Sequence, residues 1–298
     1  MIVRHGVSWA MAGALATAVL AAQAAQPVVT VRDAGLQTPE SVLHDPAADV
    51  YLVSNINGSP SEKDNNGFIS RVSPEGTVTS LRWIAGGEKG VTLNAPKGLA
   101  IVGDTLVVAD IDCVRKFNRS SGAPAGEVCI EGASFLNDVA AGDDGAVYVT
   151  DTGIRFEASG PVPTGSDAVH RIGADGTATV FVQGKELANP NGLAWTERGL
   201  IVVPFGGKEI WRYDAKGSRT TVATAPAGQF DGVVTLPDGG LLVTSWEASA
   251  IYRVSPSGEV STFASGLESP ADLGYDAGRR RAALPLFQGN AIAIFEVP

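Results

Sequence analysis

The sequence predicts an all-β fold, a six-bladed β-propeller with four-stranded antiparallel blades. Three observations favour it. A phrase of strand, turn and strand recurs six times after residue 26, the recurrences are about 40 residues apart, and no 3.6-residue hydrophobic period persists among them. Several phrases are followed by third and fourth short strands, such as "EIWRYD" and "GEVSTFA". A repeat near 40 residues with four strands per unit is typical of propeller blades.

The six phrases share one pattern, a short apolar strand, a turn rich in Asp, Gly or Pro, and a second apolar strand. Their third residues lie 57, 40, 54, 40 and 40 positions apart. We expect each phrase to form the inner half of one blade. In order they are "TPESVLHDPAADVYLVSN" from Thr38, "APKGLAIVGDTLVVAD" from Ala95, "FLNDVAAGDDGAVYVTD" from Phe135, "NPNGLAWTERGLIVVP" from Asn189, "QFDGVVTLPDGGLLVTS" from Gln229 and "SPADLGYDAGRRRAALP" from Ser269.

The two ends of the chain are predicted to close the ring. The sixth unit ends at Pro298 after only three strands, and the strand "PVVTVRD" at 27–33 precedes the first unit without a blade of its own. We expect this N-terminal strand to supply the missing outer strand of blade 6, since pairing there hides two exposed sheet edges. A double sandwich, the alternative all-β fold, does not explain the 40-residue period.

The first 24 residues have the pattern of a secretory signal peptide. A positive residue, Arg4, precedes the uncharged run "VSWAMAGALATAVLAA", and Ala22-Gln23-Ala24 is a small-x-small cleavage site. The alternative is a membrane anchor, for which the run is short and weakly apolar. We therefore expect an exported, periplasmic or secreted protein, with one propeller domain over residues 25–298 and no membrane span after cleavage.

The charge balance argues against a nucleic-acid partner. The formal net charge is −10, and "GRRR" at 278–281 is the one basic run. Binding phosphates requires a basic face, so this run is expected to be a solvated turn rather than a binding patch.

Two cysteines flank a predicted strand–turn–strand segment. Cys113 and Cys129 are equidistant from a turn centre near Ser121, so they face each other if the segment is a hairpin. Export makes a disulfide between them chemically possible. Two buried thiols are the alternative.

The third residue of each phrase begins an inner strand, so these residues are predicted to converge at one mouth of the central channel. Two carboxylates and two amides in a narrow mouth are costly to bury without a partner, and a hard divalent cation would satisfy them. An all-oxygen set favours calcium, with water completing the shell, over zinc. Ordinary turn residues without a metal are the alternative. The polar members are Glu40, Lys97, Asn137, Asn191 and Asp231; the sixth is Ala271.

Further candidates surround this ring. Asp138 and Asp272 lie one residue further along their strands, where they would orient ligands, bound water or substrate; Asp138 could instead cap its own turn. Two insertions, 56–68 in blade 1 and 152–170 in blade 3, are predicted to lie over the same mouth. His44 and His170 are expected to be structural, and no motif supports Ser-His-Asp catalysis.

The chain resembles the senescence-marker-protein/gluconolactonase/luciferin-regenerating-enzyme-like family of six-bladed propellers. The resemblance covers nearly all of residues 25–298 and lies in "PES", "LND", "PNGLAW" and "FDGV". It implies that Glu40, Asn137, Asn191 and Asp231 bind one divalent metal, usually calcium, and that the protein hydrolyses a lactone. Sugar-lactone members commonly carry an arginine where Phe135 stands, so the resemblance does not extend to a polyhydroxylated, gluconate-like substrate.

Three functions are compatible with these residues. The first is a calcium-dependent lactonase or similar ester hydrolase of a small molecule, with Asp231 as the proton acceptor and Lys97 meeting a substrate oxyanion. The alternative is a non-enzymatic cell-envelope propeller that binds a ligand or a protein and holds a structural metal. The third is a non-hydrolytic reaction, such as a condensation, at the same mouth.

Overall fold

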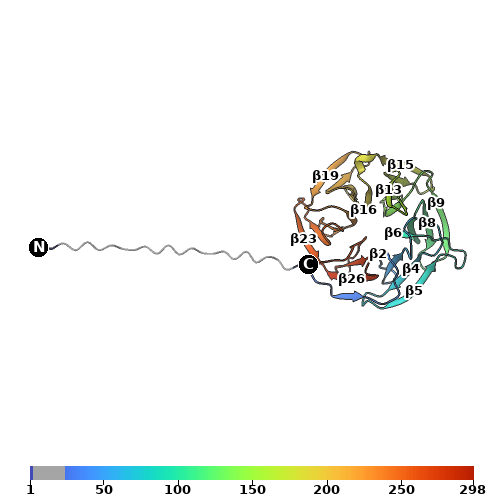
Figure 1. Cartoon of the computed structure of the whole chain (residues 1–298), viewed down its shortest axis with the longest axis horizontal. Helices are drawn as coiled ribbons and strands as arrows, with labels where there is room; N and C mark the ends of the chain where they lie inside the picture. The colour runs from blue at the N-terminus through green and yellow to red at the C-terminus, as the bar shows by residue number, and fades with distance from the viewer. Residues whose placement is uncertain (3–23) are drawn as a thin grey trace.

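The computed structural model describes residues 1–2 and 24–298. It is a ring of six four-stranded antiparallel sheets around a central channel (Figure 1), which confirms the predicted propeller. Blade 1 comprises β2 (Pro39–Asp45), β3 (Val50–Asn55), β4 (Phe68–Val72) and β5 (Val78–Ala85); blade 2 comprises β6 (Pro96–Val102), β7 (Thr105–Asp110), β8 (Cys113–Asn118) and β9 (Pro124–Cys129); blade 3 comprises β10 (Leu136–Ala141), β11 (Val147–Asp151), β14 (Ala168–Ile172) and β15 (Ala178–Gln183).

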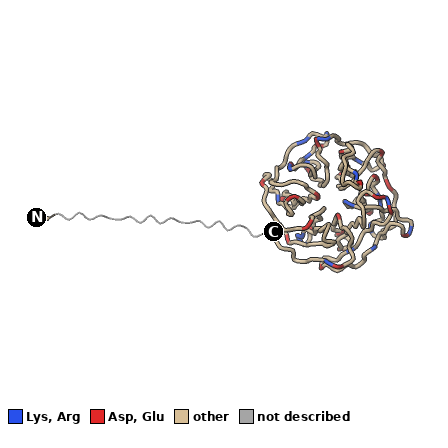
Figure 2. Tube along the Cα trace, viewed as in Figure 1, with Lys and Arg blue, Asp and Glu red and all other residues tan. Residues whose placement is uncertain are grey.

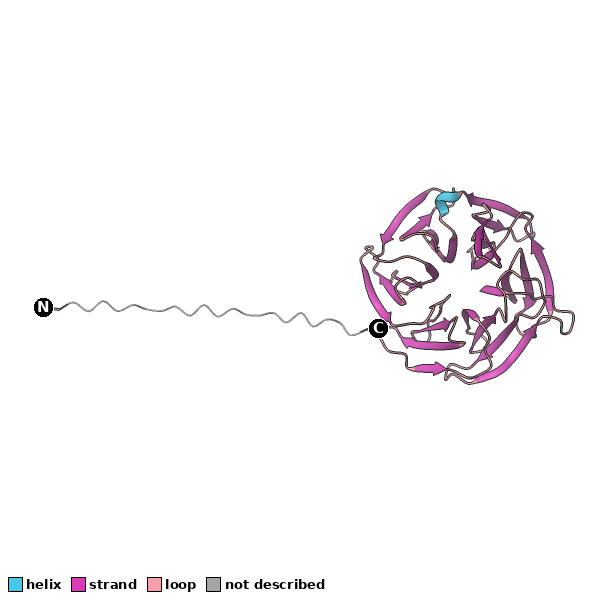
Figure 3. Ribbon diagram, in the orientation of Figure 1, coloured by secondary structure: helices cyan, strands magenta, loops and turns pink. Residues whose placement is uncertain are grey.

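The second half of the ring repeats this order, and the one described helical segment is the short 3-10 turn η1 (Lys185–Leu187), drawn in cyan in Figure 3. Blade 4 comprises β16 (Pro190–Thr196), β17 (Gly199–Pro204), β18 (Glu209–Tyr213) and β19 (Arg219–Thr224); blade 5 comprises β20 (Phe230–Thr235), β21 (Leu241–Ser245), β22 (Ala250–Val254) and β23 (Val260–Ser265); blade 6 comprises β24 (Gly274–Asp276), β25 (Arg281–Leu286) and β26 (Ala291–Glu296).

The N-terminal strand closes the ring as predicted. β1 (Val29–Val31) pairs antiparallel with β26, with Thr30 opposite Ala293. Figure 1 shows this blue strand at the rim beside the red blade 6.

The predicted signal peptide of residues 1–24 falls almost entirely outside the described residues. Within the described residues, no helix has the length and apolar character needed to cross a membrane.

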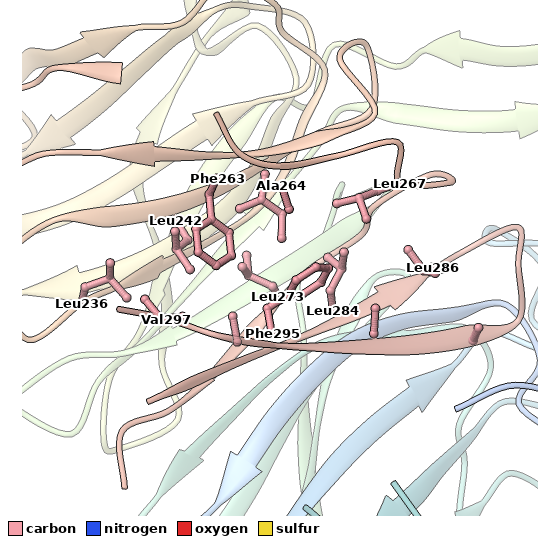
Figure 4. Packing of buried hydrophobic residues seen from close by; sticks show 14 residues of the cluster. Leu236, Leu242, Phe263, Ala264, Leu267, Leu273, Leu284, Leu286, Phe295 and Val297 are labelled. Atoms are coloured by element: carbon pink, nitrogen blue, oxygen red, sulfur yellow. The ribbon is translucent and has the colours of Figure 1, made fainter. Parts of the chain in front are cut away.

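The core lies between the faces of neighbouring blades. Six clusters of buried apolar side chains fill the six spaces between adjacent blades. Figure 4 shows the cluster between blades 5 and 6, where Leu242 and Phe263 pack near Leu284 and Phe295. Apolar burial of this kind is the main stabilising term in folding. Each blade is therefore held by two neighbours, which fixes the inner strands around the channel.

The two cysteines form the predicted disulfide. Cys113 on β8 faces Cys129 on β9, and the two are bonded through their sulfur atoms.

Charged residues are dispersed around the ring, with Lys and Arg interspersed among Asp and Glu in the view of Figure 2.

A β-bulge distorts the inner strand of each of blades 1 to 5. In blade 3, Leu136 pairs with Asp151 but Val139 pairs with Val149, so three steps on β10 match two on β11. The same shift occurs in β2, β6, β16 and β20. A bulge breaks the alternation of side chains between the two faces of a strand. The residues inside it are Asn137 and Asp138 in blade 3 and their equivalents in the other blades.

Candidate functional site

Five polar residues that the sequence singled out line one cavity of about 200 Å³. Each lies in the bulge of a different inner strand, and each is buried, with at most 5% of its surface exposed. They therefore come from five blades to one end of the channel. The five, called the polar ring below, are Glu40 on β2, Lys97 on β6, Asn137 on β10, Asn191 on β16 and Asp231 on β20.

Hydroxyl groups on the second strands satisfy the backbone at three of these bulges. The backbone N–H of Asp138 donates to the Thr150 hydroxyl at 2.9 Å, and that of Gly232 donates to the Thr244 hydroxyl at 2.8 Å. In blade 1 the N–H of Ser41 donates to Ser54 Oγ at 2.9 Å. A buried N–H must find a partner, and here the ladder does not supply one. The hydroxyls therefore stabilise the distortion that turns the site residues toward the channel.

Three oxygen atoms of the site are buried without a hydrogen-bond partner. They are Glu40 Oε2, Asn191 Oδ1 and Asp231 Oδ1. An unpaired buried polar group is costly, so several of them in one cavity indicate a ligand that accepts their lone pairs. The described residues contain no cluster of three or more His, Cys, Asp or Glu side chains. Two carboxylates and two amide oxygens do fit a hard cation such as calcium.

The amide of Asn137 is held in one orientation. Its Nδ2 donates to Thr152 Oγ1 at 3.1 Å, and that hydroxyl donates to the carbonyl oxygen of Pro190 at 2.9 Å. Because the amide nitrogen is fixed on Thr152, the amide oxygen faces away from it. This leaves the Asn137 oxygen available to a ligand in the cavity.

Burial and neighbouring negative charges raise the pKa of both site carboxyls. Burial, followed by the negative charges of Asp231 and Asp272, raises the pKa of Glu40 well above its usual range, while the charge of Lys97 opposes this. Burial and the charge of Asp272 likewise raise the pKa of Asp231, and the indole of Trp246 opposes the rise. A cation would favour the ionised forms of both carboxyls. Ionisation of both carboxyls would therefore require a compensating positive charge nearby.

Lys97 is the one positive group in this ring. Only 1% of it is exposed, its Nζ donates to the carbonyl oxygen of Ala95 at 3.0 Å, and Nζ lies 4.3 Å from the centroid of the Phe135 ring. Burial lowers the pKa of its ammonium group to about 8, against the opposing charges of Glu40 and Asp110.

Asp138 and Asp272 are separated from these five residues. They line a second cavity of about 560 Å³ that is bounded by the later parts of the inner strands. The Asp138 carboxylate accepts the N–H groups of Val139 and Leu193 at 2.7 and 2.5 Å, and Asp272 accepts the hydroxyl of Ser41. Both carboxyls thus join neighbouring residues or blades, and neither lines the cavity that holds the other five.

The glycines of the phrases make room for these two carboxylates. A Cβ on Gly98 would lie 2.3 Å from Asp138 Oδ1, and a Cβ on Gly232 would lie 2.3 Å from Asp272 Oδ1. No larger residue fits at either position without displacing the aspartate. Burial raises the pKa of Asp272 to about 7, while the Ser41 hydroxyl lowers it. Gly98 and Gly232 are therefore required because the aspartates of the neighbouring blades pack directly against them inside the channel.

A second ring, which the sequence analysis missed, lies next to the polar one. It consists of the residue that directly follows the second strand of each blade, 14 to 16 positions after the polar-ring residue or, in blade 6, after the equivalent Ala271. In five blades its N–H donates to the carbonyl of the residue two before the polar position, for example Trp246 to Gln229 at 3.0 Å. This narrow range of spacings is the signal that could have revealed it. The members are Ile56, Ile111, Thr152, Phe205, Trp246 and Phe287.

The two insertions complete the cavity, as predicted. The blade 1 insertion contributes Pro60, and the blade 3 insertion folds into the hairpin β12 (Ile154–Glu157) and β13 (Gly160–Pro163), which contributes Phe156. The insertions meet where the N–H of Phe156 donates to the hydroxyl of Ser61 at 3.3 Å. They therefore lie over the mouth that holds the polar ring.

The histidines lie outside this cavity. His44 is 3.6 and 3.7 Å from the carboxylates of Asp49 and Asp276. His170 pairs with Val149 within blade 3 and is buried, which lowers the pKa of its imidazole. Both positions agree with the structural roles that the sequence predicts.

Solved structures with the same architecture include enzymes and a calcium-binding protein. Virginiamycin B lyase from Staphylococcus aureus is 14% identical, with a TM-score of 0.65 over 91% of this chain and 99% of that chain. A gluconolactonase from Xanthomonas campestris is 18% identical, with a TM-score of 0.62 over 93% and 99%. Regucalcin, a calcium-binding protein from Agrobacterium tumefaciens, is 15% identical, with a TM-score of 0.59 over 89% and 87%. At these identities the likeness shows the fold.

Sequence comparison identifies the family. Curated proteins yield no significant match. The model of the SMP-30/Gluconolactonase/LRE-like region matches residues 65–264, which is more than half of the chain and includes four of the five polar-ring residues. The chain belongs to the SMP-30/gluconolactonase/LRE-like family.

Proposed function

We propose that this protein is an exported, calcium-dependent lactonase. The observation that carries the proposal is the set of buried oxygens without partners on Glu40, Asn191 and Asp231, which share one cavity with Asn137 and Lys97. The family and the gluconolactonase of the same fold support a hydrolase of this kind. The disulfide is compatible with export.

Four residues would bind the metal, and one of them would also accept a proton. Glu40, Asn137, Asn191 and Asp231 would hold the calcium ion, which when bound polarises a carbonyl oxygen as a Lewis acid. Asp231 would accept the proton of the attacking water, because its carboxylate lines the cavity and a bound cation would keep it ionised.

Lys97 would stabilise the negative charge that develops on the lactone oxygen. Its ammonium group is held by Ala95 and lies against the Phe135 ring, so it is positioned before substrate arrives. A fixed cation in a water-poor cavity stabilises an oxyanion more than solvent does. The bond between the carbonyl carbon and the ring oxygen would then break, the ring oxygen would receive the proton that Asp231 took from water, and the product would be a hydroxy acid.

A non-hydrolytic reaction is less well supported. The fold is shared with a lyase, and a form of that enzyme with a histidine replaced by alanine is described as catalytically inactive. In this chain neither His44 nor His170 lines the cavity. A non-enzymatic propeller that binds a ligand or a protein, with a structural metal, remains the alternative proposal.

Hydrolysis assays test the proposal. Residues 25–298 are incubated with a panel of γ- and δ-lactones in calcium or in chelator, and acid release is followed by pH indicator. Calcium-dependent turnover is expected, and Asp231→Asn should lower kcat by roughly 10²- to 10⁴-fold with the fold intact. Asp175→Asn, at an exposed turn, is the matched control. Turnover that persists in chelator, or full activity of Asp231→Asn, would contradict the mechanism.

A further inference from the structure

Three aromatic rings of adjacent blades form a continuous wall beside the polar ring. Phe205, Trp246 and Phe287 occupy equivalent second-ring positions in blades 4, 5 and 6. The ring centroids of Phe205 and Trp246 are 5.8 Å apart, and those of Trp246 and Phe287 are 5.4 Å apart. All three line the cavity. Because their backbones are fixed in the same way, the wall is part of the blade framework.

The facing side of the cavity is also apolar. Phe135 and Phe156 of blade 3 have their ring centroids 5.7 Å apart, and Ile154 of the same hairpin lies beside them. Ile56 and Pro60 of blade 1 continue this side. The polar groups are thus confined to one end of the cavity, while its sides consist of hydrocarbon surface.

The sides offer little to a hydroxyl group of a ligand. Thr152 carries the one hydroxyl on the cavity lining, and it already accepts from Asn137 and donates to Pro190. Trp246 Nε1, the remaining polar atom of the sides, interacts with the Asp231 carboxyl, whose pKa it lowers, and it provides no acceptor. Hydroxyls of a polyhydroxylated lactone would therefore lose water without gaining partners, which disfavours such a ligand.

The cavity is small. Its volume of about 200 Å³ lies below the roughly 300–1,000 Å³ of sites for drug-sized ligands. It accommodates one lactone ring with a short substituent, and a long acyl chain would extend beyond it.

We propose that this site selects small lactones whose ring carries a short alkyl or aryl substituent, and that it discriminates against polyhydroxylated sugar lactones. The polar end would bind the carbonyl group of the lactone, and the aromatic sides would pack against the ring substituent. This inference rests on the proposed function for the reaction, and on the cavity sides for the ligand class.

Binding is measured with lactams, which have the shape of lactones and resist hydrolysis. Calorimetry on residues 25–298 with calcium compares δ-valerolactam, its 6-methyl and 6-propyl derivatives, and glucono-δ-lactam. Affinity should rise roughly fourfold for each methylene group buried, and the polyhydroxylated lactam should bind more weakly than the unsubstituted one. Equal or tighter binding of glucono-δ-lactam would overturn the inference.

Two variants locate the substituent. Phe156 is 39% exposed, so Phe156→Ser should fold, and it should weaken the propyl lactam severalfold more than it weakens unsubstituted δ-valerolactam. Phe287→Leu should act in the same direction from the opposite side. Val180→Ser, at a 50% exposed apolar residue of β15, is the matched control and should change neither. Unchanged propyl-lactam affinity in both variants would contradict the assignment of the cavity sides.

The matching δ-lactones separate this inference from the proposed reaction. Faster hydrolysis of the propyl lactone than of glucono-δ-lactone, each corrected for its rate without protein, is expected. Hydrolysis of the sugar lactone in preference would overturn the ligand class and leave the lactonase proposal standing. The expected lactam preference without hydrolysis of any lactone would support the ligand class and overturn the proposed reaction.

Discussion

Thr152 holds the side-chain amide of Asn137 through a 3.1 Å hydrogen bond, and the same hydroxyl donates to Pro190 of the next blade at 2.9 Å. One side chain therefore joins Asn137 to the residue that directly precedes Asn191, its counterpart in blade 4. It also decides which atom of Asn137 faces the cavity, because a nitrogen bound to Thr152 leaves the oxygen free.

Thr152→Val removes this control while keeping the β-branched shape. The amide of Asn137 is then free to rotate, so we expect calcium affinity to fall by roughly 10- to 100-fold, as is typical for residues that orient metal ligands. Calorimetry measures it, with Thr224→Val at an exposed strand position as the matched control. An unchanged dissociation constant would show that Thr152 does not orient the ligand.

Lys97→Met is expected to have opposite effects on metal binding and on turnover. Loss of a buried positive charge near Glu40 should tighten calcium binding, because like charges no longer repel. Loss of the group that meets the oxyanion should lower kcat by roughly 10²- to 10³-fold. Calorimetry and lactone hydrolysis measure the two effects separately. A variant that weakens calcium binding would contradict the proposed role.

Lys97 should also make the stability of the metal-free protein depend on pH. Its folded-state pKa of about 8 lies below the ordinary value, so the unfolded chain binds more protons between pH 8 and about 10.4. Wild-type stability should therefore rise relative to Lys97→Met across this window, by up to about 3 kcal/mol. Urea unfolding in chelator at pH 7 and pH 10 measures it. A difference that is the same at both pH values would contradict the shift.

The fold and the polar ring could be predicted because both follow from the repeat. The 40-residue period defines the blades, and the first strand of a blade must line the channel, so residues such as Asn137 and Asp231 had to converge. The closing strand at 27–33 followed from the missing fourth strand of blade 6. None of these steps required knowledge of side-chain contacts.

The rest depends on backbone geometry that the pattern does not encode. Bulges turn Asn137 and Asp138 out of simple alternation, and the two then serve different cavities, which residue spacing alone could not separate. The aromatic wall was missed because Phe205 and Trp246 follow strands and have no common residue type with Ile56 or Thr152. Their shared position, not their chemistry, identifies the second ring.

The disulfide should stabilise the fold without affecting the site. Cys113 and Cys129 are separated by 16 positions in the outer strands of blade 2. Replacing both with Ser is expected to lower the free energy of unfolding by about 3 kcal/mol at most, through the larger entropy of the unfolded chain. Urea unfolding measures the loss. Calcium affinity should be unchanged, and a marked change in it would show that blade 2 couples to the cavity.

Calcium titration by calorimetry on residues 25–298, comparing the wild type with the Asn137→Ala/Asp231→Ala double variant, tests the metal site most directly. We predict tight one-to-one binding to the wild type, and its loss in a double variant that remains folded by circular dichroism, because two of four protein ligands are removed. Absence of calcium binding to the wild type, or undiminished binding to the double variant, would contradict the assignment of these oxygens to a metal.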